Sequence, residues 1–100
     1  MFAWDKILGF DWDDGNARKS ADKHFVSQME AEQVFFNEPL LTVPDVKHSS
    51  AERRIHALGR TDDGRLLHIT FTLREDGKKL RVISARDMSR KERSYYEQGI

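Results

Sequence analysis

The chain has 100 residues, of which 38% are apolar and 34% charged, and it lacks cysteine, which excludes disulfides, thiolate metal sites and a cysteine nucleophile. The net formal charge is zero, but residues 1–52 carry five Lys or Arg and ten Asp or Glu, whereas residues 53–100 carry twelve and seven. We therefore expect a globular domain with an acidic side and a basic side, the basic side being the contact surface.

The first residues lack the basic start and long apolar run of a signal peptide, and no apolar run approaches the length of a membrane span. A chain of this length suits one hydrophobic core. We therefore expect a single domain over residues 1–100, in a soluble cytoplasmic protein without a membrane partner.

Alternating apolar residues near the N-terminus predict a first strand over residues 7–12. Leu8, Phe10 and Trp12 would share the buried face of this strand. A tryptophan in such a position is more typical of a core residue than of a platform on which nucleobases stack.

Two helices are predicted next from their capping signals. Asp13 or Asp14 can accept hydrogen bonds from the first turn of a helix over residues 14–24. A Ser-x-x-Glu capping box opens a second helix over residues 27–37. This helix is expected to stop there because Pro39 disfavours helical geometry at the residue before it.

The C-terminal half predicts strands and a last helix. Alternating and β-branched residues predict three strands, over residues 52–60, 65–73 and 80–86. Asp63-Gly64 is a hairpin signal between the first two of these strands, and a second capping box opens a helix after Ser89. Residues 44–50, with a proline and a polar cluster, are expected to form a connecting segment.

The predicted order is therefore β-α-α-β-β-β-α. We predict an α+β fold, in which an antiparallel sheet carries the 27–37 helix against it and the C-terminal helix over one end. Residues 78–93 form the most basic stretch, with seven Lys or Arg and two carboxylates. This excess favours a polyanion or an acidic partner, although a solvated surface of a small domain would have the same composition.

An ordered series of short motifs points to a known family. The motifs are Phe10-Asp11-Trp12-Asp13, Lys23-His24, Phe36 with Glu38-Pro39, His48-Ser49, Glu52-Arg53, Leu58-Gly59-Arg60, Arg81-Val82-Ile83-Ser84-Ala85-Arg86, and Arg90, Glu92 and Tyr96. Over about residues 8–98 the chain resembles the BrnT family, the ribonuclease toxins of bacterial type II toxin–antitoxin pairs. Their fold is similar to that of RelE-type toxins.

The resemblance implies an endoribonuclease that inhibits translation and growth until a cognate antitoxin covers its basic face. That antitoxin would be BrnA-like and carry a DNA-binding part, so operator DNA would be bound only through it, whereas RNA would be the substrate. The sequence departs from the family at Asn16, Ser20 and Phe25, where lysine, asparagine and glycine are common. These departures keep open the alternative of a non-catalytic RNA- or protein-binding module with the same fold.

The departure at Phe25 concerns the backbone. A residue with a side chain adopts positive φ only at a cost, which glycine avoids. We therefore expect the turn between the two helices to differ from that of the family.

RNA cleavage without a metal needs a base for the 2′-OH proton, an acid for the leaving oxygen and cations around the phosphate. His24 with Lys23 is the candidate for proton transfer, because histidine titrates near neutral pH. A surface histidine that only closes a helix would show the same pattern. Glu52 and Arg53, at the start of a predicted strand, are further candidates, and Glu52 acts either as a base or as a partner that orients an arginine.

Arg81 and Arg86 are the candidates for stabilising the charged phosphate. Since they lie five positions apart in a strand, they should point to opposite faces unless a bulge or the strand end redirects Arg86. We favour Arg86, which lies at the junction with the last helix. The residues expected to bind RNA outside the catalytic centre are Lys79, Arg90, Lys91, Arg93 and Tyr96.

A metal site is not expected. His56 and His68 can face each other across the predicted hairpin, but no carboxylate or third histidine has ligand spacing with them. The sequence therefore predicts chemistry by side chains alone, without a metal or another cofactor.

Overall fold

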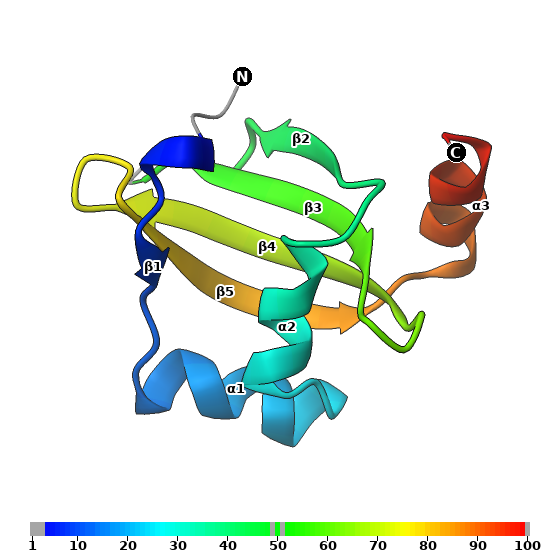
Figure 1. Cartoon of the computed structure of the whole chain (residues 1–100), viewed down its shortest axis with the longest axis horizontal. Helices are drawn as coiled ribbons and strands as arrows, with labels where there is room; N and C mark the ends of the chain where they lie inside the picture. The colour runs from blue at the N-terminus through cyan, green and yellow to red at the C-terminus, as the bar shows by residue number, and fades with distance from the viewer. Residues whose placement is uncertain (1–3, 49, 51, 100) are drawn as a thin grey trace.

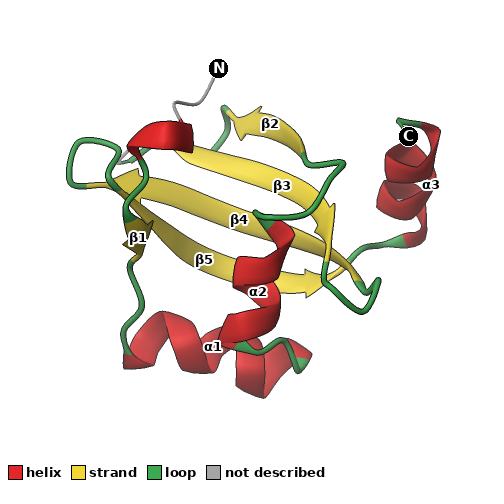
Figure 2. Cartoon of the chain, in the orientation of Figure 1, coloured by secondary structure: helices red, strands yellow, loops and turns green. Residues whose placement is uncertain are grey.

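The computed structural model describes residues 4–48, 50 and 52–99. Five strands form one sheet in the order β1-β5-β4-β3-β2; α2 packs against one face, α1 runs along β5, and α3 lies at one end (Figures 1 and 2). The elements in chain order are the 3₁₀ helix η1 (Trp4–Lys6), β1 (Gly9–Phe10), α1 (Asp14–His24), α2 (Gln28–Val34), β2 (Leu41–Asp45), β3 (Arg54–Arg60), β4 (Leu66–Arg74), β5 (Lys79–Asp87) and α3 (Arg90–Gln98). The predicted α+β class is confirmed.

The sheet is mixed, whereas the sequence predicted an antiparallel one. Strands β2 to β5 pair as antiparallel neighbours, but β1 pairs in parallel with the start of β5. A parallel neighbour needs a long crossover connection, and here the whole chain between β1 and β5 provides it. That pairing depends on contacts distant in sequence, so no local pattern could reveal it.

The C-terminal end of strand β2 overlaps residues 44–50, where a connecting segment was predicted. That prediction was therefore partly wrong. Its five residues pair with β3, from Leu41 opposite Leu58 to Asp45 opposite Arg54. Pro44 was the signal that argued against a strand. A proline is tolerated here because β2 is the edge of the sheet, where one side of the strand forms no ladder hydrogen bonds.

The first strand is shorter than residues 7–12, and one of its predicted inward residues points outward. Only Gly9–Phe10 forms strand, although hydrogen bonds from Leu8 N–H to Lys78 O and from Asp11 N–H to Leu80 O extend the pairing. Leu8 is 75% exposed. Phe10 and Trp12 pack against the core instead, together with Ile7.

The capping predictions are confirmed. Ser27 and Ser89 each form a complete capping box, and Asp13 accepts from Asn16 N–H at the start of α1. Helix α2 ends at Val34 rather than near residue 37. The N–H groups of the next two residues bond three residues back, which tightens the helix end into a 3₁₀ turn.

The core lies between α2 and the face of the sheet that we call the core face. Its buried side chains come from alternate positions of β3, β4 and β5 and from the segment around α2. They are Val26, Ala31, Val34, Ile55, Ala57, Leu67, Ile69, Phe71, Leu80, Val82 and Ala85. The side chains that alternate with them on the strands therefore point to the opposite face.

Asn16 has a structural role at the start of α1. Its side-chain NH₂ group donates to Asp11 O at 3.0 Å and to Val82 O at 2.9 Å, and its Oδ1 accepts from Asp13 N–H at 2.7 Å. The residue is buried. Asn16 thus fastens α1 to the backbone of β5, the strand that carries Arg81 and Arg86.

Phe25 adopts the left-handed conformation that was expected to be avoided, with φ of 55°. Its side chain is 80% exposed and so gains little from burial. We expect Phe25→Gly to raise the free energy of unfolding by about 1 kcal/mol, because glycine takes this φ without steric cost. Thermal unfolding of Phe25→Gly and Phe25→Ala separates the two effects, since alanine removes the ring but keeps the strain. Equal stability of the two variants would contradict this account.

Candidate functional site

The face of the sheet opposite the core carries mostly polar side chains. We call this the polar face and define it by the residues of β3 to β5 that alternate with core residues. They are Arg54, His56, Leu58, His68, Thr70, Thr72, Arg81, Ser84 and Arg86. At one end α3 covers this face, where Leu58, Met88 and Tyr96 form a small second cluster.

A bulge brings Arg81 and Arg86 to the same face. The register changes from Thr70 opposite Ser84 to Phe71 opposite Val82, so one extra residue is inserted in β5. Such an insertion reverses the alternation beyond it. Arg81 and Arg86 therefore both point to the polar face. A regular strand would have placed them on opposite faces, and the bulge that the sequence analysis allowed as an exception is present.

Arg86 is held by the first turn of α3. Its Nη1 and Nη2 donate to the two oxygens of Glu92 at 2.8 and 2.9 Å, and Nη1 also donates to Asp87 O. The Arg86 hydrogen bonds lower the pKa of Glu92 to about 2. Because the folded pKa is depressed, this pair stabilises the fold above the ordinary pKa of 4.5, and the contribution is lost as the pH falls towards 2.

Two histidines lie next to Arg86 in the centre of the polar face. The rings of His56 and His68 have centroids 4.8 Å apart, so the predicted approach across the hairpin is confirmed. His68 is opposite Arg86 in the register and lies 3.9 Å from Glu92. Burial lowers the pKa of His68, and the positive charge of Arg86 lowers it further, which favours the neutral imidazole.

A carboxylate from β2 completes this group. Asp45 Oδ2 is 3.0 Å from His56 Nε2, and His56 Nδ1 is 3.0 Å from Thr70 Oγ1. Sequence analysis found no carboxylate for the histidines because β2 was not recognised as a strand. The signal that could have found it is the strand pairing itself, which places Asp45 and His56 on adjacent strands.

Arg81 lies at the other end of the polar face. It donates to Asp11 at 3.3 Å and to Asp13 at 2.9 Å, both in the segment that leads into α1. The Arg81 hydrogen bond contributes to the lowered pKa of Asp13, after that from Asn16. A shallow hollow of about 260 Å³ is lined here by Gly15, Asn16, Lys19, Glu52, Arg54, Arg81, Val82 and Ile83.

Glu52 pairs with an arginine, Arg74, at 3.1 Å. The carbonyl oxygen of Arg53 accepts from Thr72 Oγ1 at 2.6 Å. Glu52 and Arg53 therefore lie at the start of β3, on the Arg81 side of the polar face and away from the two histidines.

Lys23 and His24 lie outside the polar face. They end α1, where His24 O and Phe25 O accept hydrogen bonds from Arg65. Arg65 also binds Glu30 and Asp87, and Asp87 is opposite the core residue Leu67, so this network belongs to the core side of the sheet. The geometry does not join His24 to Arg86 in one site.

The predicted RNA-binding residues include one that is buried. Tyr96 is 1% exposed, and its hydroxyl donates to Pro39 O at 2.6 Å, so its ring cannot stack on a base in this structure. Its neighbour Tyr95 is 58% exposed. The cations predicted with it remain accessible at the surface or partly so, and they are Lys79, Arg90, Lys91 and Arg93.

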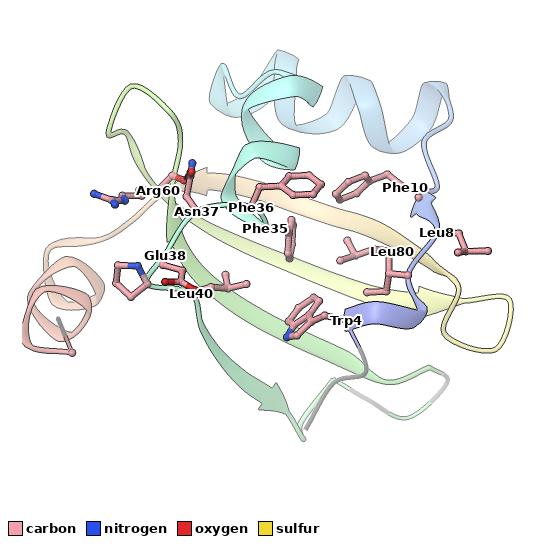
Figure 3. Close-up of a pocket in the computed structure, with 14 residues that line it drawn as sticks. Trp4, Leu8, Phe10, Phe35, Phe36, Asn37, Glu38, Leu40, Arg60 and Leu80 are labelled. Atoms are coloured by element: carbon pink, nitrogen blue, oxygen red, sulfur yellow. Dashed lines mark hydrogen bonds between the residues drawn. The ribbon is translucent and has the colours of Figure 1, made fainter.

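A larger hollow of about 1110 Å³ opens on the core side (Figure 3). Aromatic and aliphatic side chains from η1, β1 and the segment after α2 converge on it, with Arg60 and Asn37 at one end (Figure 3). This lining offers apolar contact but no pair of groups suited to acid–base chemistry. The polar face is therefore the stronger candidate for a catalytic surface.

Among residues 4–48, 50 and 52–99, no group of three or more histidines and carboxylates is placed to hold a metal ion. Each helix in the same part of the chain is too short or too polar to traverse a lipid bilayer.

Comparison with known proteins identifies one family. The family model for BrnT, the ribonuclease toxin of type II toxin–antitoxin systems, matches residues 12–92. These residues include the whole polar face, and the match confirms the resemblance found in the sequence. A comparison with curated proteins gave no match.

Proposed function

Because the chain belongs to the BrnT family of ribonuclease toxins from type II toxin–antitoxin systems, we propose that it is an endoribonuclease with its catalytic surface on the polar face. The ribose 2′-OH attacks the adjacent phosphate, and no metal takes part. The products are a 2′,3′-cyclic phosphate and a 5′-hydroxyl end. The same proposal includes a RelE-like fold, which the β3–β4–β5 meander and the terminal α3 support.

The observation that carries this proposal is the position of Arg86 beside two histidines on the polar face. Its contacts with Glu92 and Asp87 number three, whereas a guanidinium has five N–H donors, so donors remain for a phosphate. The pair with Glu92 fixes the guanidinium before substrate arrives. Such preorganised donors stabilise the charge that develops on the phosphorane.

The partner of a type II toxin is a protein antitoxin. We propose that a BrnA-like antitoxin with a DNA-binding part covers the polar face and the basic residues near α3, and thereby blocks RNA. Operator DNA is then bound only through the antitoxin. Both proteins act in the cytoplasm, where the free toxin inhibits translation and growth.

The decisive test is cleavage of RNA by the purified chain in excess EDTA. We expect full activity and products with 2′,3′-cyclic phosphate and 5′-hydroxyl ends, because the nucleophile is the substrate's own 2′-OH. The measurement is gel separation of a labelled RNA, with end analysis by phosphatase and kinase treatment. An RNA with 2′-deoxy substitution at the cleaved position is the control and should resist cleavage.

Two results would contradict this function. Activity that EDTA abolishes and Mg²⁺ or Mn²⁺ restores would reject the metal-independent mechanism. A chain that binds RNA and never cleaves it would favour the non-catalytic binding module.

A further inference from the structure

We infer that Asp45, His56 and Thr70 form a proton relay that removes the proton of the attacking 2′-OH. The inference rests on the proposed function, because it names the base for that reaction. It assigns the role of base to His56, with partners on the two neighbouring strands, rather than to His24 at the end of α1.

The three side chains are joined by two hydrogen bonds of equal length. His56 Nε2 lies 3.0 Å from Asp45 Oδ2, and His56 Nδ1 lies 3.0 Å from Thr70 Oγ1. Asp45 and Thr70 are buried, whereas the side chain of His56 is 34% exposed. In this order the carboxylate orients the imidazole, and the imidazole acts as the base that takes a proton from the hydroxyl.

The carboxylate determines the tautomer of the imidazole. An ionised Asp45 can only accept, so the His56 nitrogen facing it carries the proton. Nδ1 is then an acceptor, and the hydrogen bond must come from the Thr70 hydroxyl. Burial alone would raise the pKa of Asp45, but the hydrogen bonds from the side chain and backbone of His48 oppose this effect and help to lower that pKa, which keeps the carboxylate ionised.

The cleavage step needs only the RNA, the relay residues and water. The 2′-oxygen forms a bond to phosphorus as the bond from phosphorus to the 5′-oxygen breaks. The 2′-OH proton passes to Thr70 Oγ1 while the hydroxyl proton of Thr70 passes to His56 Nδ1. Water protonates the 5′-oxygen, and the imidazolium later returns its proton to solvent through Thr70.

The side chains around the relay come from the neighbouring strands and from the segment after β2. His48 donates to Asp45 through its backbone N–H and through Nδ1, which lies 2.9 Å from Oδ2, the same oxygen that faces His56. Arg54 lies opposite Asp45 in the register, and the ring of His68 is tilted by 39° to that of His56, with the centroids 4.8 Å apart. Arg86, which is paired with Glu92, lies opposite His68 in the register, so its guanidinium and the relay belong to the same face of the sheet.

The test compares two threonines on the same strand and face. Thr70→Val removes the relay hydroxyl, whereas Thr72→Val removes a hydroxyl that donates to Arg53 O. Single-turnover cleavage at saturating RNA should fall by about 10²-fold in Thr70→Val, with unchanged RNA affinity. The rate should recover to within a few-fold in Thr70→Ser and stay at the wild-type value in Thr72→Val.

The pH profile adds a readout that a structural role would not change. The relay makes the imidazole of His56 the base, so the rate should rise with pH in the wild type, and in His56→Gln that limb should flatten. Equal losses in Thr70→Val and Thr72→Val, or a wild-type limb in His56→Gln, would overturn the relay.

Nitrogen-15 NMR of the histidine side chains tests the relay without cleavage. The relay requires neutral His56 to carry its proton on Nε2, and Asp45→Asn should change that tautomer. A proton on Nδ1 in the wild type overturns the relay, whether or not RNA is cut. Absence of cleavage together with an Nε2 proton would reject the proposed function while supporting the relay geometry.

Discussion

Arg86→Lys is expected to lower the cleavage rate at saturating RNA by about 10²–10³-fold, the usual cost of losing one preorganised donor to a developing charge. Lysine keeps the positive charge but not the planar fork of N–H groups. RNA affinity should therefore change much less than the rate. Single-turnover kinetics with a titration of RNA measures the two quantities separately.

Lys79→Ala provides the contrast for this prediction. Lys79 lies at the start of β5, seven positions before Arg86, and is partly exposed, and we propose that its charge contacts the RNA backbone. Loss of a phosphate contact should weaken binding and reduce its salt dependence, with little effect on the rate at saturation. Arg86→Lys with the wild-type rate at saturating RNA would exclude Arg86 from the catalytic step.

Stability must be measured on the same Arg86 variant, because Arg86 also holds Glu92. The Glu92 carboxylate accepts from Ser89 N–H as well, so the capping box of α3 survives the substitution. Circular dichroism and the melting temperature of Arg86→Lys report whether the fold is intact. A loss of cleavage in a fully folded variant is then a loss of chemistry.

The sequence predicted correctly the helix starts and the hairpin turn, because interactions between residues close in the chain determine them. Both capping boxes need only residues three apart, and the Asp63-Gly64 turn needs only a glycine that accepts positive φ, observed here as 85°. Strand β2 was missed because Pro44 opposes a strand locally and is tolerated only at a sheet edge. Edge position is a property of the whole sheet.

The candidate site was also predicted only in part, because some of its features are local in sequence and others depend on strand pairing. Arg86 could be chosen because it ends a strand before a capped helix, and both features are local. The side of the sheet that it occupies depends on the bulge opposite Thr70 and Phe71. Asp45 and His56 meet through strand pairing, and His24, which lies next to a lysine in the sequence, is placed by α1 on the core side.

Phe71→Ala is expected to lower the free energy of unfolding by about 3–5 kcal/mol, the usual cost of truncating a buried phenylalanine. Phe71 is fully buried on the core face, with its ring centroid 5.2 Å from that of Phe35 and 6.2 Å from that of Trp4. Alanine would leave a cavity between η1, α2 and the sheet. Since small domains are stable by roughly 5–15 kcal/mol, the melting temperature should fall markedly.

Phe36→Ala is the matched control, because it removes the same ring from a side chain that is 78% exposed. Its effect should stay within about 0.5 kcal/mol, as for most surface substitutions. Denaturant unfolding of both variants gives the two values on one scale. Similar losses would mean that the ring packing between Phe35 and Phe71 does not stabilise the sheet. A large loss for Phe71→Ala alone would show that the core face supports the strands from which Thr70 and Arg86 project on the other side.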